Sequence, residues 1–221
     1  MILFDYAPII LNATWITIQI ALSSLLIGLI LSLIFTGLEF SPYKIIKWPT
    51  FLFVTMIRGL PEMLIILFIF FGLTELIYLL TGVYIELSPF WSGTIALSLI
   101  FASYASQSIR GALKAVSIGQ KNAALSLGFK KTSIFFYFIL PQAIRHAIPG
   151  LTNQWLVLLK DTALVSLIGV TELLKQSQLI ATATQQSFNW YAIVAVIYLF
   201  ISFISKCLIN KIEKKYSLQG S

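Results

Sequence analysis

Two carboxylates lie in otherwise apolar stretches of the chain, and they are the residues best suited to bind a charged ligand. Asp161 falls near the middle of an apolar run from 149 to 170. A carboxylate in such a run is costly unless it faces water, a partner or a ligand. Because a planar guanidinium can give a carboxylate two hydrogen bonds at once, Asp161 is a candidate for binding a cationic amino acid. The alternative is a structural ion pair with Lys160 or Arg58 of the same or of the other subunit. Lys160 lies about 100° away around a helix, on a different side unless the helix unwinds.

Glu62 is the second candidate carboxylate. It follows Arg58 by four residues, so the two would pair on a continuous helix, but Gly59 and Pro61 predict a bend between them. Glu62 is therefore either the partner of Arg58 or a second acidic group that lines a binding site. Three neutral side chains of the 149–170 run either add hydrogen bonds to such a site or bond across helices: Thr162, Asn153 and Gln154.

The segments that hold these residues have the composition of membrane helices. Of 221 residues, 58% are hydrophobic and 10% are charged, and the mean hydropathy is +0.92, which excludes an ordinary soluble domain. A net charge of +7 is also typical of nucleic-acid binding, but here the positions of the charges favour membrane loops instead. No polar segment is long enough for a separate module, so residues 1–221 are expected to form one membrane domain.

The apolar runs and the charges between them predict the topology. Each run is long enough to cross about 30 Å of hydrocarbon. Lysine and arginine are absent before the first run, present after it at Lys44 and Lys47, absent after the second and abundant after the third. This alternation predicts an all-α fold with five transmembrane helices, the N-terminus outside and the C-terminus inside. The runs cover about 9–35, 50–80, 89–108, 149–170 and 190–208.

A basic, helix-forming loop separates the third and fourth runs. Residues 121–127 are predicted to form a short helix that ends at Gly128 in a left-handed conformation. Thr132 is expected to cap a second helix, and Pro141 and Pro149 to mark the return to the membrane. The residues alone leave two interpretations open. The loop is an interfacial hairpin held by anionic lipid, or it is a docking helix for a soluble partner.

The sequence offers nothing for catalysis. It contains no phosphate-binding loop of the Gly-x-x-x-x-Gly-Lys-Ser/Thr type and no nucleophile beside a base. A lone His146 without a cluster of ligands is poor evidence for a metal site, and the single Cys207 is expected to serve packing. We therefore expect neither an enzyme nor a cofactor in the chain itself.

The loop resembles the EAA loop of ABC importer permeases. It has Asn122-Ala123-Ala124, three residues, Gly128, nine residues, and then Phe138-Ile139-Leu140-Pro141. Asn122 stands where the family has Glu, and Phe138 where it has Ile, so any salt bridge of that Glu is lost here. Three further segments resemble the polar amino acid branch of these permeases: 58–62, 104–112 and 159–168.

The resemblance implies a function and its partners. It implies a type I importer fold in the bacterial inner membrane, with 112–141 as the cytoplasmic coupling loop. Separate ATP-binding subunits would supply energy from ATP-Mg, and an extracytoplasmic solute-binding protein would deliver an amino acid, with arginine the leading candidate. A second permease, identical or related, would complete the pathway. No nucleic acid is implied. The ATPase-coupling residues would be Ser117, Asn122, Ala123, Ala124, Gly128, Leu140 and Pro141.

Two other functions are compatible with the residues. A secondary carrier would use Glu62 and Asp161 as proton or cation sites, but five spans divide poorly into inverted repeats. A membrane scaffold would recruit a soluble protein through the basic loop, and Asp161 would then be dispensable for uptake.

Overall fold

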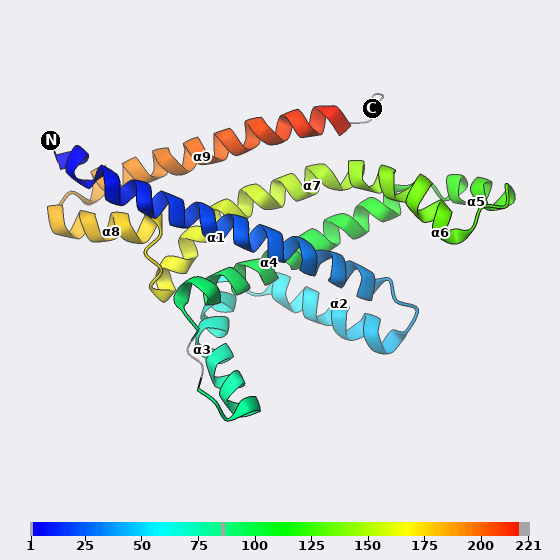
Figure 1. The fold of residues 1–221 in the computed structure, drawn as a ribbon, viewed down its shortest axis with the longest axis horizontal. Coiled ribbons are helices and arrows are strands. Elements are labelled where there is room, and N and C mark those ends of the chain that lie inside the picture. The colour runs from blue at the N-terminus through cyan, green and yellow to red at the C-terminus, as the bar shows by residue number, and fades with distance from the viewer. Residues whose placement is uncertain (1, 85–86, 217–221) are drawn as a thin grey trace.

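The computed structural model describes the backbone of residues 2–84 and 87–216 and the side chains of 5–84 and 87–211. All regular secondary structure in this part of the chain is helical, as the sequence predicts. Most helices form one elongated bundle, and α5 and α6 cap the end opposite the N-terminus (Figure 1). The elements are α1 (Ile2–Glu39), α2 (Lys44–Gly59), α3 (Glu62–Thr81), α4 (Pro89–Ala115), α5 (Ile118–Ser126), α6 (Lys131–Ile134), η1 (Phe135–Ile139), α7 (Leu140–Asp161), η2 (Thr162–Ile168), α8 (Leu173–Thr184) and α9 (Ser187–Tyr216).

Helix α4 forms the centre of the bundle. It packs against α1, α2, α3, α7 and η2, and about half of its residues are buried. Many of those residues are small, and small residues allow membrane helices to approach closely. A Cβ added at Gly28 of α1 would lie 2.7 Å from Cδ1 of Phe101, and one at Gly93 would lie 2.8 Å from Cγ1 of Val165. These two glycines therefore permit the crossings of α1 and η2 with α4.

Only three helices are both long and apolar enough to cross a membrane by themselves among the residues described. They are Asp5–Glu39 within α1, Glu62–Thr81 (α3) and Ser187–Lys211 within α9. The central helices α4 and α7 have 27 and 22 residues, but small and polar side chains lower their hydropathy. Central helices face other helices rather than lipid, which makes such residues tolerable. The count of five spans stays a prediction.

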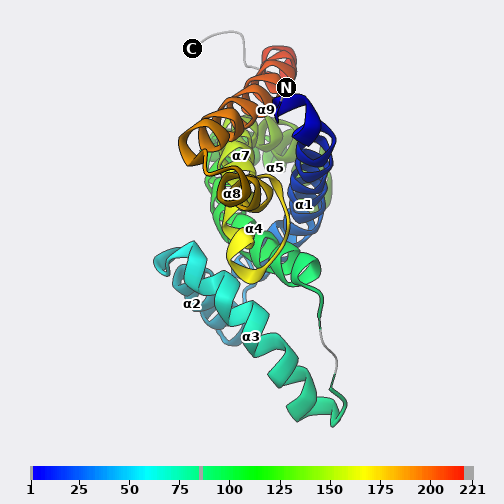
Figure 2. The ribbon, with the colours of Figure 1, turned by 90° about the vertical axis from the view of Figure 1, so that its left-hand side faces the viewer.

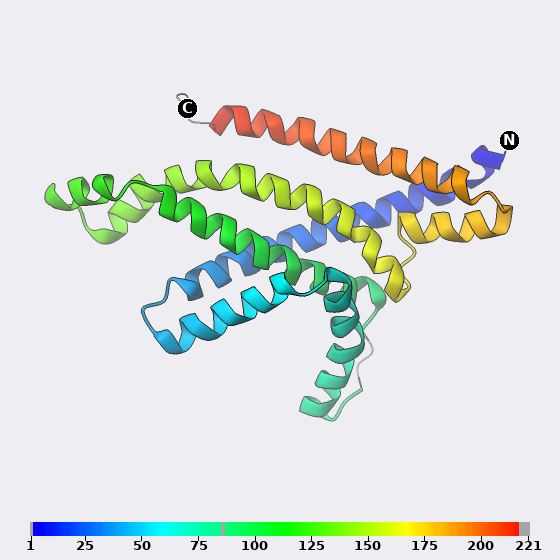
Figure 3. The same cartoon turned by 180° about the vertical axis from the view of Figure 1, so that it is seen from behind.

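The second apolar run is divided into two helices. Helix α2 ends at Gly59, Leu60 is extended, and α3 begins at Glu62, which confirms the predicted bend. Beyond the bend, α3 leaves the bundle at a steep angle and projects from it (Figures 2 and 3). Most of its side chains are exposed or half-buried.

A single helical segment joins the loop end of the bundle to its middle. Elements α6, η1, α7 and η2 follow one another without a break over residues 131–168. The segment contains one turn of π-helix at Phe135–Ile139 and ends as a 3₁₀-helix. Pro149 lies inside α7, so the helix runs through it without a break. Its position at the membrane boundary stays a prediction. Membrane helices tolerate such an internal proline through local adjustment of the backbone.

Candidate functional site

The bend between α2 and α3 brings the two predicted carboxylates together. Glu62 is the first residue of α3, and Asp161 is the last residue of α7. Helix α3 packs against η2, which begins directly after Asp161. Ile65 and Ile66, one turn after Glu62, pack in the same hydrophobic cluster as Leu158, one turn before Asp161. Both carboxylates are half-buried. Two negative charges 99 positions apart in sequence therefore lie in one region of the molecule. We call the region of Glu62 and Asp161 the acidic junction.

Neither carboxylate has a salt-bridge partner among the side chains described, where the only ion pair joins Glu39 and Arg110. Lys160 is exposed whereas Asp161 is half-buried, so the two neighbours point to different sides of the helix. The helix tightens into 3₁₀ geometry after Asp161 and does not unwind. In this conformation the ion pairs of Asp161 with Lys160 or Arg58, which the sequence leaves open, do not form.

Arg58 is held near this region by an aromatic ring rather than by Glu62. Its guanidinium carbon lies 5.4 Å from the centroid of the Tyr104 ring. The Tyr104 hydroxyl donates a hydrogen bond of 3.4 Å to the Arg58 carbonyl oxygen. The i, i+4 pair of Arg58 with Glu62 is absent from the side chains described, because the chain bends between them. Arg58 and Tyr104 thus lie where α2 packs against α4, just before the start of α3.

The three neutral candidates lie in different surroundings. Thr162 is fully buried and donates a 2.7 Å hydrogen bond to the Leu159 carbonyl oxygen, so its hydroxyl is already used within its helix. Asn153 is exposed and Gln154 is half-buried. Asn153 lies about 12 Å before Asp161 along the helix axis. The structure therefore brings Asp161 and Glu62 together, and places Asn153 and Gln154 roughly two turns away.

The loop end of the molecule is a capped helical turn. The Ser117 hydroxyl accepts a 3.3 Å hydrogen bond from the Gly119 N–H, so α5 begins three residues earlier than predicted. Gly128 has φ +80°, as predicted. Its N–H donates to Leu125, and the N–H of Phe129 donates to Ala124, a pair of bonds that defines a Schellman motif.

Side-chain contacts fasten α5 to the 131–168 segment. Gln142 donates a 2.6 Å hydrogen bond to the Gln120 side chain, and the rings of Phe129 and Phe138 meet edge to face at 5.3 Å. The expected capping role of Thr132 is wrong. Helix α6 begins at Lys131, after Lys130, which makes no side-chain cap.

The predicted coupling residues mostly face outward. Ser117, Asn122, Ala123, Gly128 and Pro141 are exposed, Leu140 is half-buried and Ala124 is buried. The same loop exposes large apolar side chains, with Leu127 77% and Ile118 74% exposed. Exposed apolar side chains of this size at the end of a bundle are typical of a surface that another protein or a membrane covers.

A buried polar cluster near the loop end was not predicted from the sequence. Arg110 of α4 pairs with the buried Glu39 at the end of α1, and Gln107 donates a 3.1 Å hydrogen bond to the same carboxylate. The guanidinium of Arg110 also lies 6.0 Å from the centroid of the Phe51 ring of α2. The missed signal is a stripe of small and polar residues at spacings of three, four, seven or eight on α1, all buried: Thr17, Ser24, Ser32, Thr36 and Glu39.

A second polar cluster, also missed, joins helices at the opposite end. The fully buried Glu172 accepts hydrogen bonds from the N–H groups of Leu174 and Lys175 and caps α8. The Tyr198 hydroxyl of α9 donates 2.9 Å to the same carboxylate. Thr17 of α1 accepts from the neighbouring Leu173 N–H. The N-cap preference for acidic residues is the signal that could have found it.

This arrangement of helical bundle, capped loop and acidic junction defines a class of integral membrane protein rather than a soluble enzyme. Residues 24–218 match the family described as "Binding-protein-dependent transport system inner membrane component", and the chain belongs to that family. The family resemblance expected from the loop motif is thereby confirmed.

Three relatives illustrate the match. The chain is 49% identical over 213 residues to the arginine ABC transporter permease protein ArtQ of Haemophilus influenzae, covering 96% of both chains. It is 33% identical to the histidine/lysine/arginine/ornithine transport system permease protein HisQ of Escherichia coli, covering 98% of this chain and 96% of HisQ. A crystal structure of an amino acid ABC transporter with histidines superposes with a TM-score of 0.88 at 30% identity, covering 96% of both chains.

Proposed function

We propose that the chain is the membrane-spanning subunit of an ATP-driven importer for basic amino acids, with arginine as the leading substrate. The relatives named for arginine and for histidine/lysine/arginine/ornithine transport support this substrate class. Asp161 and Glu62 supply the matching chemistry, since a guanidinium or ammonium group balances carboxylates that have no salt-bridge partner among the described side chains.

The observation that carries the proposal is the unbroken helical segment 131–168. One end is fastened to α5 and the other end holds Asp161. A soluble ATPase that grips α5 and moves on binding ATP would displace the carboxylate end through this segment, because a helix does not absorb the displacement as a coil would. The exposed Leu127 is the proposed anchor. ATP-Mg belongs to the partner ATPase, and this chain is a transport subunit with no catalytic role.

The orientation in the membrane and the partner proteins follow from the same proposal. The end of the molecule that carries α5 holds most of the loop lysines, so it faces the cytoplasm, with the N-terminus outside and the C-terminus inside. The five crossings are α1, the α2–α3 pair, α4, α7 and α9, in a bacterial inner membrane. A solute-binding protein docks at the outer end near α8. A second permease subunit covers the exposed polar face of α7 that carries Asn153 and Lys160.

Cross-linking from α5 tests the proposal. Cys207 is exposed, so the experiment uses a Cys207→Ser background, with a benzophenone probe on Ser126→Cys and a control probe on Ser187→Cys at the opposite end. We expect Ser126→Cys to capture a nucleotide-hydrolysing subunit in native membranes and Ser187→Cys not to capture it. Capture of phospholipid alone from Ser126→Cys would contradict the proposal.

A further inference from the structure

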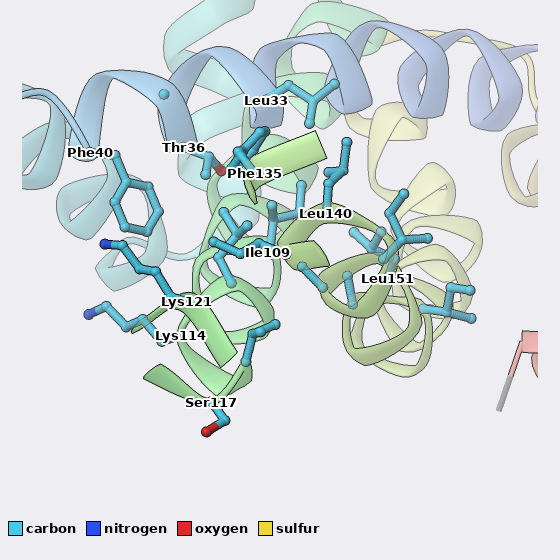
Figure 4. Close-up of a pocket in the computed structure, with 18 of the residues that line it drawn as sticks. Leu33, Thr36, Phe40, Ile109, Lys114, Ser117, Lys121, Phe135, Leu140 and Leu151 are labelled. Carbon is cyan, nitrogen blue, oxygen red and sulfur yellow. The ribbon is translucent and has the colours of Figure 1, made fainter. Parts of the chain in front are cut away.

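A groove runs along the bundle near its loop end, and neither Asp161 nor Glu62 lines it. It has a volume of about 890 Å³, within the range of roughly 300–1,000 Å³ typical of ligand pockets. Its walls come from the second half of α1, the end of α4, the start of α5 and the 135–151 stretch (Figure 4). Representative lining residues are Leu33, Thr36, Ile109, Leu140 and Leu151. The groove is thus almost entirely apolar along its length.

The end of the groove nearest the loop carries two positive charges. Lys114 of α4 and Lys121 of α5 line it, and Figure 4 shows their side chains reaching out on the same side beside Phe40. Both lysines are exposed, and neither forms an ion pair with any side chain in the part of the chain that the structure describes. An apolar channel that ends in two cations matches an amphiphile with an apolar tail and an anionic head.

The groove is separate from the proposed solute pathway. Leu140, Ala147 and Leu151 lie on one face of α7 and line the groove. None of the four residues Asp161, Glu62, Asn153 and Gln154 lines the groove. A cationic amino acid would also be repelled by Lys114 and Lys121. The ligand of the groove is therefore not the transported solute.

We infer that this groove binds one anionic phospholipid of the cytoplasmic leaflet, with an acyl chain along the apolar wall and the headgroup phosphate between Lys114 and Lys121. The inference rests on the proposed orientation, in which α5 lies at the cytoplasmic surface. Basic pockets between membrane helices on that side are suited to anionic headgroups, because lysines there combine with the negative surface of the leaflet. Such a lipid joins the end of α4 to the start of α5, and so braces the base of the coupling loop.

Direct lipid binding tests the inference. The full chain, purified in mild detergent with the subunits that accompany it, is titrated with phosphatidylglycerol and with phosphatidylcholine of the same acyl chains, and bound lipids are counted by native mass spectrometry. We expect one phosphatidylglycerol to bind at least about tenfold more tightly than phosphatidylcholine, and the preference to vanish in Lys114→Gln/Lys121→Gln. The matched control Lys44→Gln/Lys47→Gln removes two exposed lysines of α2 outside the groove and should keep the preference.

A second variant tests the apolar wall. Gly37 lines the groove, and a Cβ there meets no atom within 4 Å, so Gly37→Leu fills the groove without disturbing the packing of the bundle. We expect Gly37→Leu to lose the tight phosphatidylglycerol site, and the control Gly111→Leu, an open position outside the groove, to retain it.

Three outcomes would overturn the inference. They are equal binding of the two lipids, an unchanged preference in the double lysine variant, or cross-linking of Gly37→Cys to a second permease copy instead of lipid. Because mass spectrometry reports the lipid itself, this experiment can fail while α5 still captures an ATPase, and the ATPase capture can fail while the lipid still binds.

Discussion

At the scale of single residues, the acidic junction is the feature that separates the possible functions. Asp161 and Glu62 come from different helices and have no salt-bridge partner among the described side chains. A purely structural carboxylate in a bundle interior has a partner, as Glu39 and Glu172 do here. The contrast favours ligand binding for Asp161 and Glu62.

Asp161→Asn tests this role. Loss of a charge-assisted hydrogen bond of about 1.5–3 kcal/mol should lower kcat/KM for arginine uptake by roughly 10- to 100-fold. Uptake of a neutral amino acid by the same variant should fall by less than about threefold. Radiolabelled uptake into vesicles that contain the companion subunits measures both. An equal loss for the two substrates would support a structural role for Asp161.

The buried pair of Glu39 and Arg110 leads to a prediction about stability. Arg110→Met leaves a buried carboxylate without its counter-charge and should lower the free energy of unfolding by about 3–5 kcal/mol. Replacing both partners, as Glu39→Gln/Arg110→Met, should restore most of that loss. Thermal unfolding in detergent measures the difference. If the double variant is as unstable as Arg110→Met, the stabilisation arises from packing of the arginine stem rather than from its charge.

At the scale of elements, the turn after α5 depends on one glycine. Gly128 has φ +80°, a conformation that a β-branched residue adopts only with strain. Gly128→Val should therefore reorient α5 and lower arginine uptake per ATP hydrolysed by at least about tenfold, while hydrolysis continues.

Gly111→Val is the matched control, because Gly111 lies within α4, is exposed and has open space around it. Uptake and hydrolysis measured in the same proteoliposomes give the ratio. Normal coupling in Gly128→Val would refute the role of a rigid loop.

The crossing of α1 and α4 depends on a second glycine. Gly28→Ala places a methyl group 2.7 Å from Phe101 and 3.1 Å from the Ser98 carbonyl oxygen, so the helices must separate. We expect a loss of about 1–3 kcal/mol in the free energy of unfolding. Gly37→Ala in the same helix meets no neighbour and should be neutral or slightly stabilising, since alanine favours helices. Thermal melts of the two variants, which should move in opposite directions, provide the measurement.

Local sequence predicted these elements better than it predicted their contacts. The turn at Gly128 and the bend between Arg58 and Glu62 follow from glycine and proline within a few residues, and both were found. Pro149 does not interrupt α7, because tertiary surroundings allow a proline inside a membrane helix. The pairing of Glu39 with Arg110 was missed because it joins residues 71 positions apart.

At the scale of the whole molecule, one long helical segment connects the loop end with the region of Asp161 and Glu62. The loop end that carries α5 and the region of Asp161 and Glu62 share no side chain, yet residues 131–168 join them without a break. The candidate carboxylates were predictable from their cost in an apolar run. Their convergence was not, because it depends on how α3 leaves the bundle (Figure 2).

A stiff connection carries influence in both directions. Coupling free energies between two sites are reciprocal. If ATPase binding at α5 changes the affinity of the acidic end of residues 131–168 for substrate, bound substrate must change the affinity of the ATPase for α5 by the same factor. Saturating arginine should then alter the dissociation rate of nucleotide-free ATPase subunits from the purified permease, and Asp161→Asn should abolish the change. Substrate bound at the acidic end would in this way change how the ATPase binds on the cytoplasmic side of the membrane.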